Sequence, residues 1–531
     1  MLYPNCQKNK VFLLLNTLVY LQVRQFFYQL KNRFFQSDFH LYEFPIVNNT
    51  LSFEQSVNKS KSYDGKDNIT FLNIPSRFSS WNDTSKGMLW AYNLNYMDWL
   101  CQEEMDFKTG AVWIDKFIDE LPLNKVGLDP YPIALRGINW IKFICLHKEQ
   151  VDAKNLERWN TSLYSQYRLL EKKLEYHLLG NHLLEDAFSL FIGALYFSDK
   201  RLYKKAVRLL YRELDEQILP DGAHYELSPM YHCILLERLL DCYNFSSHNR
   251  IFPQQEKTDG FLKEKAVLML GHLEEVVYSD GSIPLLNDAA YGIAPTASQL
   301  FAYARRLDIS WEPVLMKECG YRKMANERME LILDVGNVIS SYQPGHSHAD
   351  ALNYELRTDG KPFIIDTGIS TYDKTERRQY ERGTSAHNTV VVDGYDSAEV
   401  WGGFRMARRA EVSIVSEEIN HVVAKHSGVE KGLGHHRSFK LHSTNMEITD
   451  EVHIGHEGIS YIHFAPDVRI LSCSCNEVDT ERGRVIIENA KQVEIFDERM
   501  SCQYNTFNSI KVVAIHFQGR MKYRVEMNKT C

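Results

Sequence analysis

The chain has 531 residues, of which 44% are apolar and 12% aromatic, enough to fill two large hydrophobic cores. Its formal net charge of −8 argues against a general nucleic-acid-binding protein, because such proteins present a strongly basic surface to phosphates. The ten cysteines are scattered and form no CxxC pair, which indicates free or buried thiols rather than a disulfide framework. We therefore expect a two-domain protein that binds no nucleic acid.

An apolar run, Val11–Val23, follows Lys8 and Lys10 near the N-terminus. Its length suits the core of a signal peptide, but no small-x-small cleavage site follows it. The alternative is an amphipathic helix through Phe34 that packs on the protein or touches a membrane, since the run is too short and polar to span a bilayer. Asn, Ser and Lys are frequent at 46–75, which predicts a surface loop or linker.

Apolar residues recur at helical spacing from about residue 85 to 325, and the loops between these stretches are short. This pattern indicates a helical toroid or bundle. After about residue 329 the chain changes to short β-branched runs separated by turn residues, which predict an all-β module; they lie at 330–334, 338–342, 363–366, 389–393 and 493–496. The expected fold class is multidomain α+β, divided into an N-terminal helix and linker segment at 1–80, a helical domain at 81–328 and a β domain at 329–531.

The segment Gly180–Glu185 begins a strongly apolar helix and places Asn181, His182 and Glu185 on one face. The unpaired N–H groups at a helix start suit a substrate carboxylate. The alternative is that Asn181 only caps the helix and that His182 is satisfied locally.

A second polar cluster lies in Asp221–His232, which holds two tyrosines, two histidines and a glutamate just before another apolar helix. A tyrosine can take a proton as phenolate and return it as phenol, so Tyr231 is a candidate acid and base, with Tyr225 as an alternative. The competing interpretation is an ordinary helix start whose aromatic rings fill the core.

Two histidines, His346 and His348, alternate in an extended segment and therefore point to one side. His348, Asp366 and His387 together offer two imidazoles and one carboxylate, a common zinc ligand set with one position open. The alternative is that these histidines are only hydrogen-bonded.

A basic stretch from 372 to 409 predicts a cleft for an acidic ligand. Arg378, Arg382 and Arg405 can bind carboxylate or sulfate, and Trp401 can stack on sugar rings. The alternative is a solvated run of charges paired with neighbouring glutamates.

Taken together, these motifs resemble the heparinase II/III family of polysaccharide lyases, and within it the heparin-sulfate lyases. Their order and joint presence carry the resemblance over roughly residues 85–470; the motifs are GNHLLED at 180–186, DGAHYELSPMYH at 221–232, PLLND at 284–288, GHSHAD at 345–350, IIDTG at 364–368, RGTSAHNTVVVDG at 382–394 and WGGFRMARRA at 401–410. The resemblance implies an incomplete α/α toroid followed by an antiparallel β-sandwich, with the active site between them.

The resemblance also implies roles for individual residues. Asn181, with His182 beside it, matches the residue that neutralises the substrate carboxylate, Tyr231 matches the acid and base, and His346 matches the histidine that assists proton abstraction. Glu185, Tyr225 and Tyr372 are expected to contact substrate. The metal-site candidates His348, Asp366 and His387 resemble the ligands of one structural divalent metal, and we predict zinc.

The expected reaction is β-elimination in an acidic polysaccharide, which leaves a 4,5-unsaturated uronate at the new non-reducing end. One alternative is a glycoside hydrolase that uses Glu185 and Glu226 as its two carboxyl groups. Another is a non-catalytic glycan-binding protein of polysaccharide assembly. The family favours a periplasmic or secreted protein, although a cytoplasmic location stays open. The sequence does not choose the glycan, its sulfation, endo or exo action, or the oligomeric state.

Overall fold

The structure, a computed structural model, describes residues 9–35 and 37–528, so Lys8 of the N-terminal basic segment lies outside the described residues. Helices dominate the first 306 residues. Their bounds are α1 Lys10–Leu18, α2 Val23–Phe34, α3 Met88–Tyr96, α4 Phe107–Glu120, α5 Pro130–Leu146, α6 Ala153–Lys173, α7 Gly180–Tyr196, α8 Lys200–Gln217, α9 Pro229–His248, α10 Gln255–Val276 and α11 Ala297–Arg306, with the short α12 Glu376–Glu381 further on.

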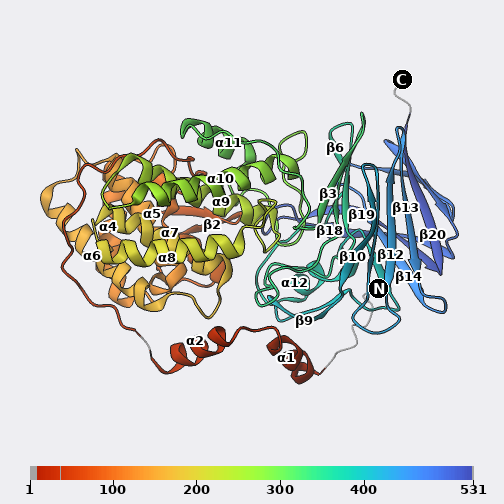
Figure 1. The fold of residues 1–531 in the computed structure, drawn as a ribbon, viewed down its shortest axis with the longest axis horizontal. Helices are drawn as coiled ribbons and strands as arrows, with labels where there is room; N and C mark the ends of the chain where they lie inside the picture. The colour runs from red at the N-terminus through yellow and green to blue at the C-terminus, as the bar shows by residue number, and fades with distance from the viewer. Residues whose placement is uncertain (1–8, 36, 529–531) are drawn as a thin grey trace.

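The helical domain consists of two layers of antiparallel helices. Helices α5, α7 and α9 are buried on nearly every side, whereas α6 and α8 each bury one stripe and expose charged residues on the other. The apolar sequence of α7 therefore marks an inner helix, packed between α5, α8 and α9. Figure 1 shows these helices side by side in the left half of the molecule, as the predicted incomplete α/α toroid requires.

Antiparallel strands form the second half of the molecule. A hairpin, β1 Asn68–Phe71 and β2 Ile74–Arg77, precedes the helices; the remaining strands are β3 Tyr321–Ala325, β4 Met329–Asp334, β5 Tyr354–Thr358, β6 Lys361–Ile364, β7 Val390–Val392, β8 Ala398–Trp401, β9 Arg405–Arg409, β10 Val412–Glu418, β11 His421–His426, β12 His435–Leu441, β13 Asn445–Val452, β14 Glu457–His463, β15 Ile470–Cys473, β16 Glu477–Thr480, β17 Gly483–Glu488, β18 Gln492–Met500, β19 Asn508–Gln518 and β20 Arg520–Met527.

Apart from β1-β2 and the two-stranded sheet β8-β9, these strands build three sheets that pack around one apolar core. The largest has eight strands in the order β10-β11-β12-β13-β20-β17-β16-β15, and the two four-stranded sheets have the orders β18-β19-β14-β7 and β3-β4-β5-β6. The predicted strands at 330–334, 389–393 and 493–496 are confirmed as β4, β7 and β18. The run at 338–342 is irregular instead, because it crosses between the two domains and pairs with no sheet.

A buried ion pair stabilises the loops of the β domain. Arg437 of β12 donates to both carboxylate oxygens of Asp450, at 2.6 and 2.9 Å, and to the carbonyls of Leu352 and Asn388. Leu352 and Asn388 follow closely on His348 and His387, so this arginine anchors the loops that carry the two histidines.

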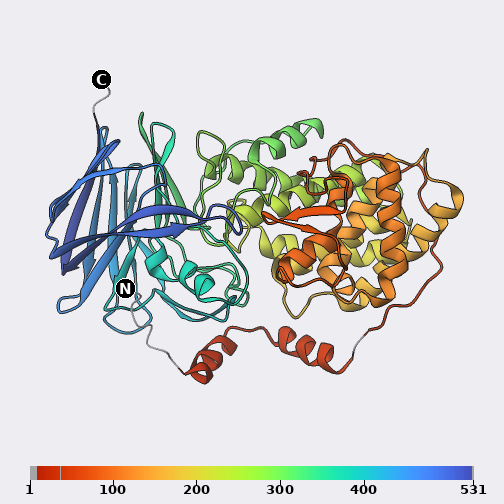
Figure 2. The same cartoon turned by 180° about the vertical axis from the view of Figure 1, so that it is seen from behind.

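The N-terminal arm runs along the outside of both domains (Figures 1 and 2). Thr17 of α1 donates to the Met406 carbonyl on β9, and Gln25 of α2 donates to the carbonyls of Leu178 and Tyr342. In the described part of the chain no single helix has the length and apolar character to cross a membrane; α1 and α2 meet that criterion only as a pair bent by 116°.

The segment 46–75 is more ordered than the predicted surface loop or linker. It contains β1, and its Leu51, Val57 and Tyr63 are buried against the helical domain. The polar composition misleads here because Asn, Ser and Lys alternate with the few apolar residues that attach the segment to the toroid.

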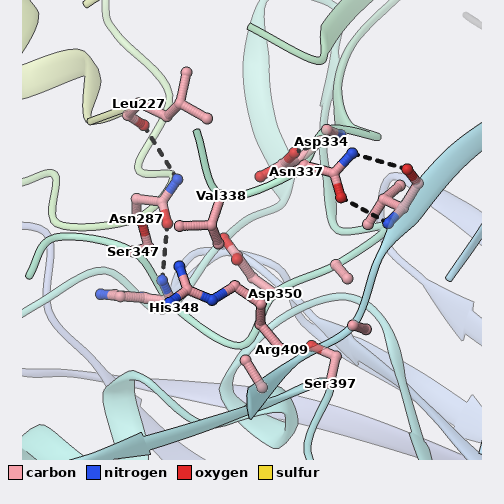
Figure 3. A pocket seen from close by; sticks show the side chains of 15 residues that line it. Leu227, Asn287, Asp334, Asn337, Val338, Ser347, His348, Asp350, Ser397 and Arg409 are labelled. Atoms are coloured by element: carbon pink, nitrogen blue, oxygen red, sulfur yellow. Dashed lines mark hydrogen bonds between the residues drawn. The ribbon is translucent and has the colours of Figure 1, made fainter. Parts of the chain in front are cut away.

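The two domains are joined by buried hydrogen bonds. The Asn287 side chain donates to the Leu227 carbonyl at 3.1 Å and accepts from the His348 N–H at 2.9 Å, as Figure 3 shows. Tyr278 donates to Glu355 of β5 at 2.8 Å. Because these groups have no access to water, the polar contacts fix one relative orientation of the domains.

Candidate active site

The candidate active site lies where the starts of the inner helices face the loops of the β domain. Asn181 is the second residue of α7, Tyr231 lies in the first turn of α9, and His346 comes from the loop before β5. The loop between α10 and α11 contributes Asp288. Four segments far apart in the sequence thus place polar side chains at one point.

The backbone around this point is unusual. Leu179, Leu227 and Asn287 have positive φ angles of 65°, 57° and 56°, which non-glycine residues rarely adopt. Each of them lies within two residues of a side chain of the site. Such conformations cost of order 1–3 kcal/mol each and tend to occur at functional sites, where the surrounding structure enforces them.

Glu226 anchors the start of α7. Its carboxylate accepts from the Asn181 backbone N–H and from Asn181 Nδ2, each at 2.9 Å. A Cβ on Gly180 would lie 2.3 Å from Glu226 Oε1, so only glycine permits this approach. The N-cap position is Leu179, and the Asn181 side chain points into the site instead of capping the helix.

His346 and Asp288 form a buried dyad. His346 Nδ1 lies 2.8 Å from Asp288 Oδ2, and Asn181 Nδ2 lies 3.3 Å from His346 Nε2. With its proton on Nδ1, facing the Asp288 carboxylate, a neutral imidazole presents its lone pair at Nε2, where Asn181 Nδ2 donates and Glu226 Oε2 lies 3.5 Å away. This tautomer leaves Nε2 as a base.

Asp288 is held by three partners. Arg378 donates to both of its oxygens, at 2.5 and 2.7 Å, and His348 Nε2 lies 2.8 Å from Oδ1. Burial alone raises the pKa of the Asp288 carboxyl, but Arg378 and the two histidines hold it well below its usual range. Asp288 therefore carries a negative charge beside His346.

Tyr231 packs directly on His346. Their ring centroids are 3.9 Å apart, and the Tyr372 hydroxyl donates to the Tyr231 oxygen at 3.2 Å. Burial raises the pKa of Tyr231 above its ordinary value, so its hydroxyl is protonated at neutral pH. The Tyr225 hydroxyl lies near Gly180 at the start of α7, where it bonds to Tyr342 at 3.2 Å and does not touch His346. Between the two tyrosines, the geometry thus favours Tyr231 as the acid.

His182 lies at the edge of the site. Its Nδ1 is 3.1 Å from Glu175 Oε2, and its ring packs on Tyr131 with centroids 4.7 Å apart. Burial lowers the pKa of His182, but the Glu175 carboxylate outweighs this effect and leaves the pKa above its ordinary value. With 28% of its side chain exposed, a protonated His182 can meet an anionic ligand.

The arginines of the predicted cleft have other partners. Arg378 pairs with Asp288, and Arg382 is buried and donates only to backbone carbonyls, including those of Ser347 and Gly403. Burial lowers the pKa of Arg382 to about 9. The prediction that these two arginines contact substrate is not supported by this geometry, whereas Arg405 is exposed and has its guanidinium 4.7 Å from the Trp401 ring.

Two further predicted contact residues lie away from the site. Trp401 donates through Nε1 to Thr17 of the N-terminal arm at 3.0 Å, so it attaches α1 to the β domain. Glu185 is fully buried within the helices, 3.5 Å from Arg238, and burial raises the pKa of Glu185 to about 7. Of the predicted contact residues, Tyr372 is the one that touches both Tyr231 and His346.

The three predicted metal-site residues are neighbours, and Asp366 bonds to one of the two histidines. The rings of His348 and His387 have centroids 5.3 Å apart, and His348 Nδ1 and His387 Nε2 are buried without a hydrogen-bond partner. Asp366 instead accepts from His387 Nδ1 at 2.7 Å. Two free imidazole nitrogens fit a metal, with Asp366 orienting one of them.

Close packing of three possible ligand atoms occurs at a different place. Within 9–35 and 37–528, Asp221, His272 and Cys319 form the one group of three whose ligand atoms all lie within 4.8 Å of one another. A buried Asp/His/Cys group able to hold a metal ion is therefore present, and it is not the predicted set.

Asp288 and Glu226 hold the side chains of the candidate site in place, and the sequence analysis gave neither of them this position. Asp288 lies in the quoted motif at 284–288, but its role depends on two histidines that lie 58 and 60 positions further along the chain. The sequence signal that could have identified Asp288 is the Asn-Asp pair at the end of an apolar run. Glu226 was considered only as a hydrolase carboxyl, although both its oxygens are occupied by Asn181.

An incomplete α/α toroid joined to an antiparallel β-sandwich, with functional side chains at the junction, defines the structural class. Residues 137–305 match the family model Heparinase II/III N-terminus, and residues 308–526 match Heparinase II/III-like, C-terminal. The chain belongs to the heparinase II/III family.

Two curated relatives share limited identity with the chain. A heparin-sulfate lyase of Pedobacter heparinus is 24% identical over 243 residues, covering 40% of this chain and 36% of that protein. A heparin-sulfate lyase of Bacteroides stercoris is 23% identical over 330 residues, covering 54% and 46%. The chain thus spans less than half the length of these two relatives.

Solved structures support the fold. A heparinase III crystal structure matches with a TM-score of 0.67 at 17% identity and covers 82% of this chain and 77% of that one. A heparan sulfate lyase from Pedobacter heparinus matches with a TM-score of 0.57 at 17% identity, covering 88% and 82%. At this identity the likeness extends to the architecture, the toroid followed by the sandwich.

Proposed function

We propose that the protein is a polysaccharide lyase that cleaves a uronate-containing acidic glycan by β-elimination. The observation that carries this proposal is the contact between Tyr231 and His346, whose ring centroids lie 3.9 Å apart, with Asn181 beside them. Elimination needs a base, an acid and a donor that neutralises the carboxylate, and these three side chains supply one of each. The names of the curated relatives make heparan sulfate the first glycan to test, together with bacterial capsule or exopolysaccharide.

His346 is the base in this mechanism. Asn181 Nδ2 and protonated His182 bind the uronate carboxylate. This contact replaces the hydrogen bond from Asn181 Nδ2 to His346 Nε2. His346 Nε2 then removes the C5 proton, the C4–O4 bond breaks, and the Tyr231 hydroxyl gives its proton to O4. The product carries a C4–C5 double bond, and a proton passes from His346 to solvent and from solvent to Tyr231 before the next turnover.

Tyr231 suits the acid role better than the base role. Its raised pKa keeps the phenol protonated, whereas the His346 tautomer with its proton on Nδ1 offers Nε2 as the base. A hydrolase would instead need two carboxyl groups facing each other across the bond. Both oxygens of Glu226 accept from Asn181, which disfavours that alternative.

Ultraviolet absorbance tests the proposal, because the unsaturated uronate absorbs and a hydrolysis product does not. We expect a rise when the protein is mixed with one member of a panel of heparan sulfate, heparin, hyaluronan, alginate and bacterial capsule. New reducing ends without absorbance would identify a hydrolase instead. Binding without either signal would identify a non-catalytic glycan-binding protein.

The pH dependence should report on His182. Its cationic form binds the carboxylate, so KM should rise as pH increases through its raised pKa. In Glu175→Gln the stabilising carboxylate is lost while burial still lowers the pKa, and the rise in KM should move to lower pH. Measurement of KM against pH for both proteins checks this. An unchanged profile would remove His182 from carboxylate binding.

We also propose that one structural divalent metal, zinc, is held through His348 Nδ1 and His387 Nε2. The two orphaned nitrogens and the support of His387 by Asp366 favour it. The metal would fix the two loops. His348 also borders a cavity of about 30 Å³ with Asp334, Asp350 and Arg409 (Figure 3), so buried carboxyl groups are at hand as further ligands.

A location outside the cytoplasm, in the periplasm or secreted, fits an acidic polysaccharide substrate and is part of the proposal. Membrane contact through the N-terminal arm is a further part. Val19 and Val23 are 80% and 85% exposed, and 9–35 contains four basic and no acidic residues, a composition that suits an anionic lipid surface. Cell fractionation and sedimentation with anionic vesicles test these two proposals separately.

A further inference from the structure

Three segments of the chain meet behind the active site around Asp221, His272 and Cys319. Asp221 lies in the loop between α8 and α9, His272 lies on α10, and Cys319 lies two residues before the start of β3. One ligand atom of each lies within 4.8 Å of the others, and the three residues are only 2%, 3% and 0% exposed. A carboxylate, an imidazole and a thiol are thus gathered in the interior from distant parts of the sequence.

Two glycines make this approach possible. A Cβ on Gly222 would lie 2.0 Å from the Leu268 carbonyl oxygen, so glycine lets the Asp221 loop touch α10. A Cβ on Gly271 would lie 2.4 Å from the carbonyl oxygen of Glu312, so glycine also lets the segment before Cys319 contact that helix. Close packing on both sides of His272 holds the group together.

The side chains are poised for coordination. His272 Nδ1 has no hydrogen-bond partner although it is buried. Asp221 Oδ2 accepts from the backbone N–H groups of Lys317 and Cys319, at 3.0 and 2.9 Å. These bonds orient the carboxylate, and Cys319 is a free thiol.

We propose that Asp221, His272 and Cys319 bind a zinc ion. Zinc takes sulfur, nitrogen and oxygen ligands at about 2.0–2.3 Å, and three protein ligands leave one tetrahedral position for water. Ligand atoms of such a site are about 3.5 Å apart, so each pair that now lies within 4.8 Å has to close by at most about 1.3 Å. Binding converts the Cys319 thiol to a thiolate and releases its proton to solvent.

The site has a structural consequence. It joins the segment that enters the β domain to the loop that leads into 224–231, which carries Tyr225, Glu226 and Tyr231. This zinc is independent of the one assigned to His348 and His387, and it does not depend on the proposed reaction. Its presence would restrain the domain junction.

Cobalt substitution distinguishes this site by its sulfur ligand. The full chain, stripped of metal and loaded with Co²⁺, should show a thiolate-to-cobalt charge-transfer band in the near ultraviolet. Cys319→Ser should lose the band and about one equivalent of zinc per chain. Cys233→Ser, at a buried thiol with no assigned ligand role, and His387→Gln should both keep the band.

X-ray absorption of the zinc-loaded His387→Gln protein gives a second test that leaves the three ligands intact. It should show one sulfur at about 2.3 Å from zinc. Asp221→Asn, which retains an acceptor for the two backbone N–H groups, should bind zinc at least tenfold more weakly. The proposal fails if the wild type has no thiolate band, if Cys319→Ser binds metal as the wild type does, or if zinc has no sulfur neighbour.

Discussion

Replacement of Tyr231 by phenylalanine should lower kcat by about 10²- to 10⁴-fold, the usual contribution of a positioned acid. The ring remains and keeps its stacking on His346, so the fold and substrate binding should change little. What is lost is the proton that the leaving O4 needs. The rate of absorbance increase at saturating glycan, with KM measured separately, checks this expectation.

Tyr225→Phe is the matched control. It removes a hydroxyl of the same kind from the same segment, but that hydroxyl bonds to Tyr342, which in turn donates to Glu216. We expect kcat within about threefold of the wild type and a small loss of stability, about 1 kcal/mol, from the broken hydrogen bond. If Tyr225→Phe abolished turnover and Tyr231→Phe did not, the two roles would have to be exchanged.

Much of the fold could be predicted because burial leaves a periodic trace in the sequence. The inner helix α7 is apolar all round and the outer helix α8 has one apolar stripe, so the change between layers is visible in the amino-acid pattern itself. The run at 338–342 has the composition of a strand but no partner strand. A segment forms a strand only when a neighbouring strand pairs with it, and the sequence of one segment does not identify that partner.

The positions of the candidate site residues could be predicted where a motif is local, and not where they depend on contacts between domains. Asn181 and Tyr231 lie at helix starts, which the sequence indicates directly. Arginine is usually a surface residue, yet Arg378 and Arg382 are both buried at the junction. A carboxylate and several backbone carbonyls accept hydrogen bonds from them there. Those partners come from 284–288, 344–347 and 403–405, and pairing over such distances is set by the tertiary fold.

Asp288→Asn should lower kcat by about 10²- to 10⁴-fold and also destabilise the protein. The amide is neutral and presents hydrogens toward His346, His348 or Arg378, all of which donate to Asp288 in the structure. His346 then loses the acceptor that fixes its Nδ1 proton, and Nε2 no longer faces the substrate as a base. Arg378 is left with an unpaired buried charge, which costs about 3–5 kcal/mol. Kinetics at saturating glycan and urea unfolding measure the two effects.

A second substitution separates catalysis from stability. In the double variant Asp288→Asn, Arg378→Met, the buried charge is absent, so part of the lost unfolding free energy should return. Turnover should stay low because His346 still lacks its carboxylate. Arg378→Met alone retains the bond between Asp288 and His346 and should lower stability more than kcat. If turnover recovered together with stability in the double variant, Asp288 would serve the fold alone, and the orientation of His346 would have to come from Tyr372, whose hydroxyl lies 3.4 Å from Nδ1.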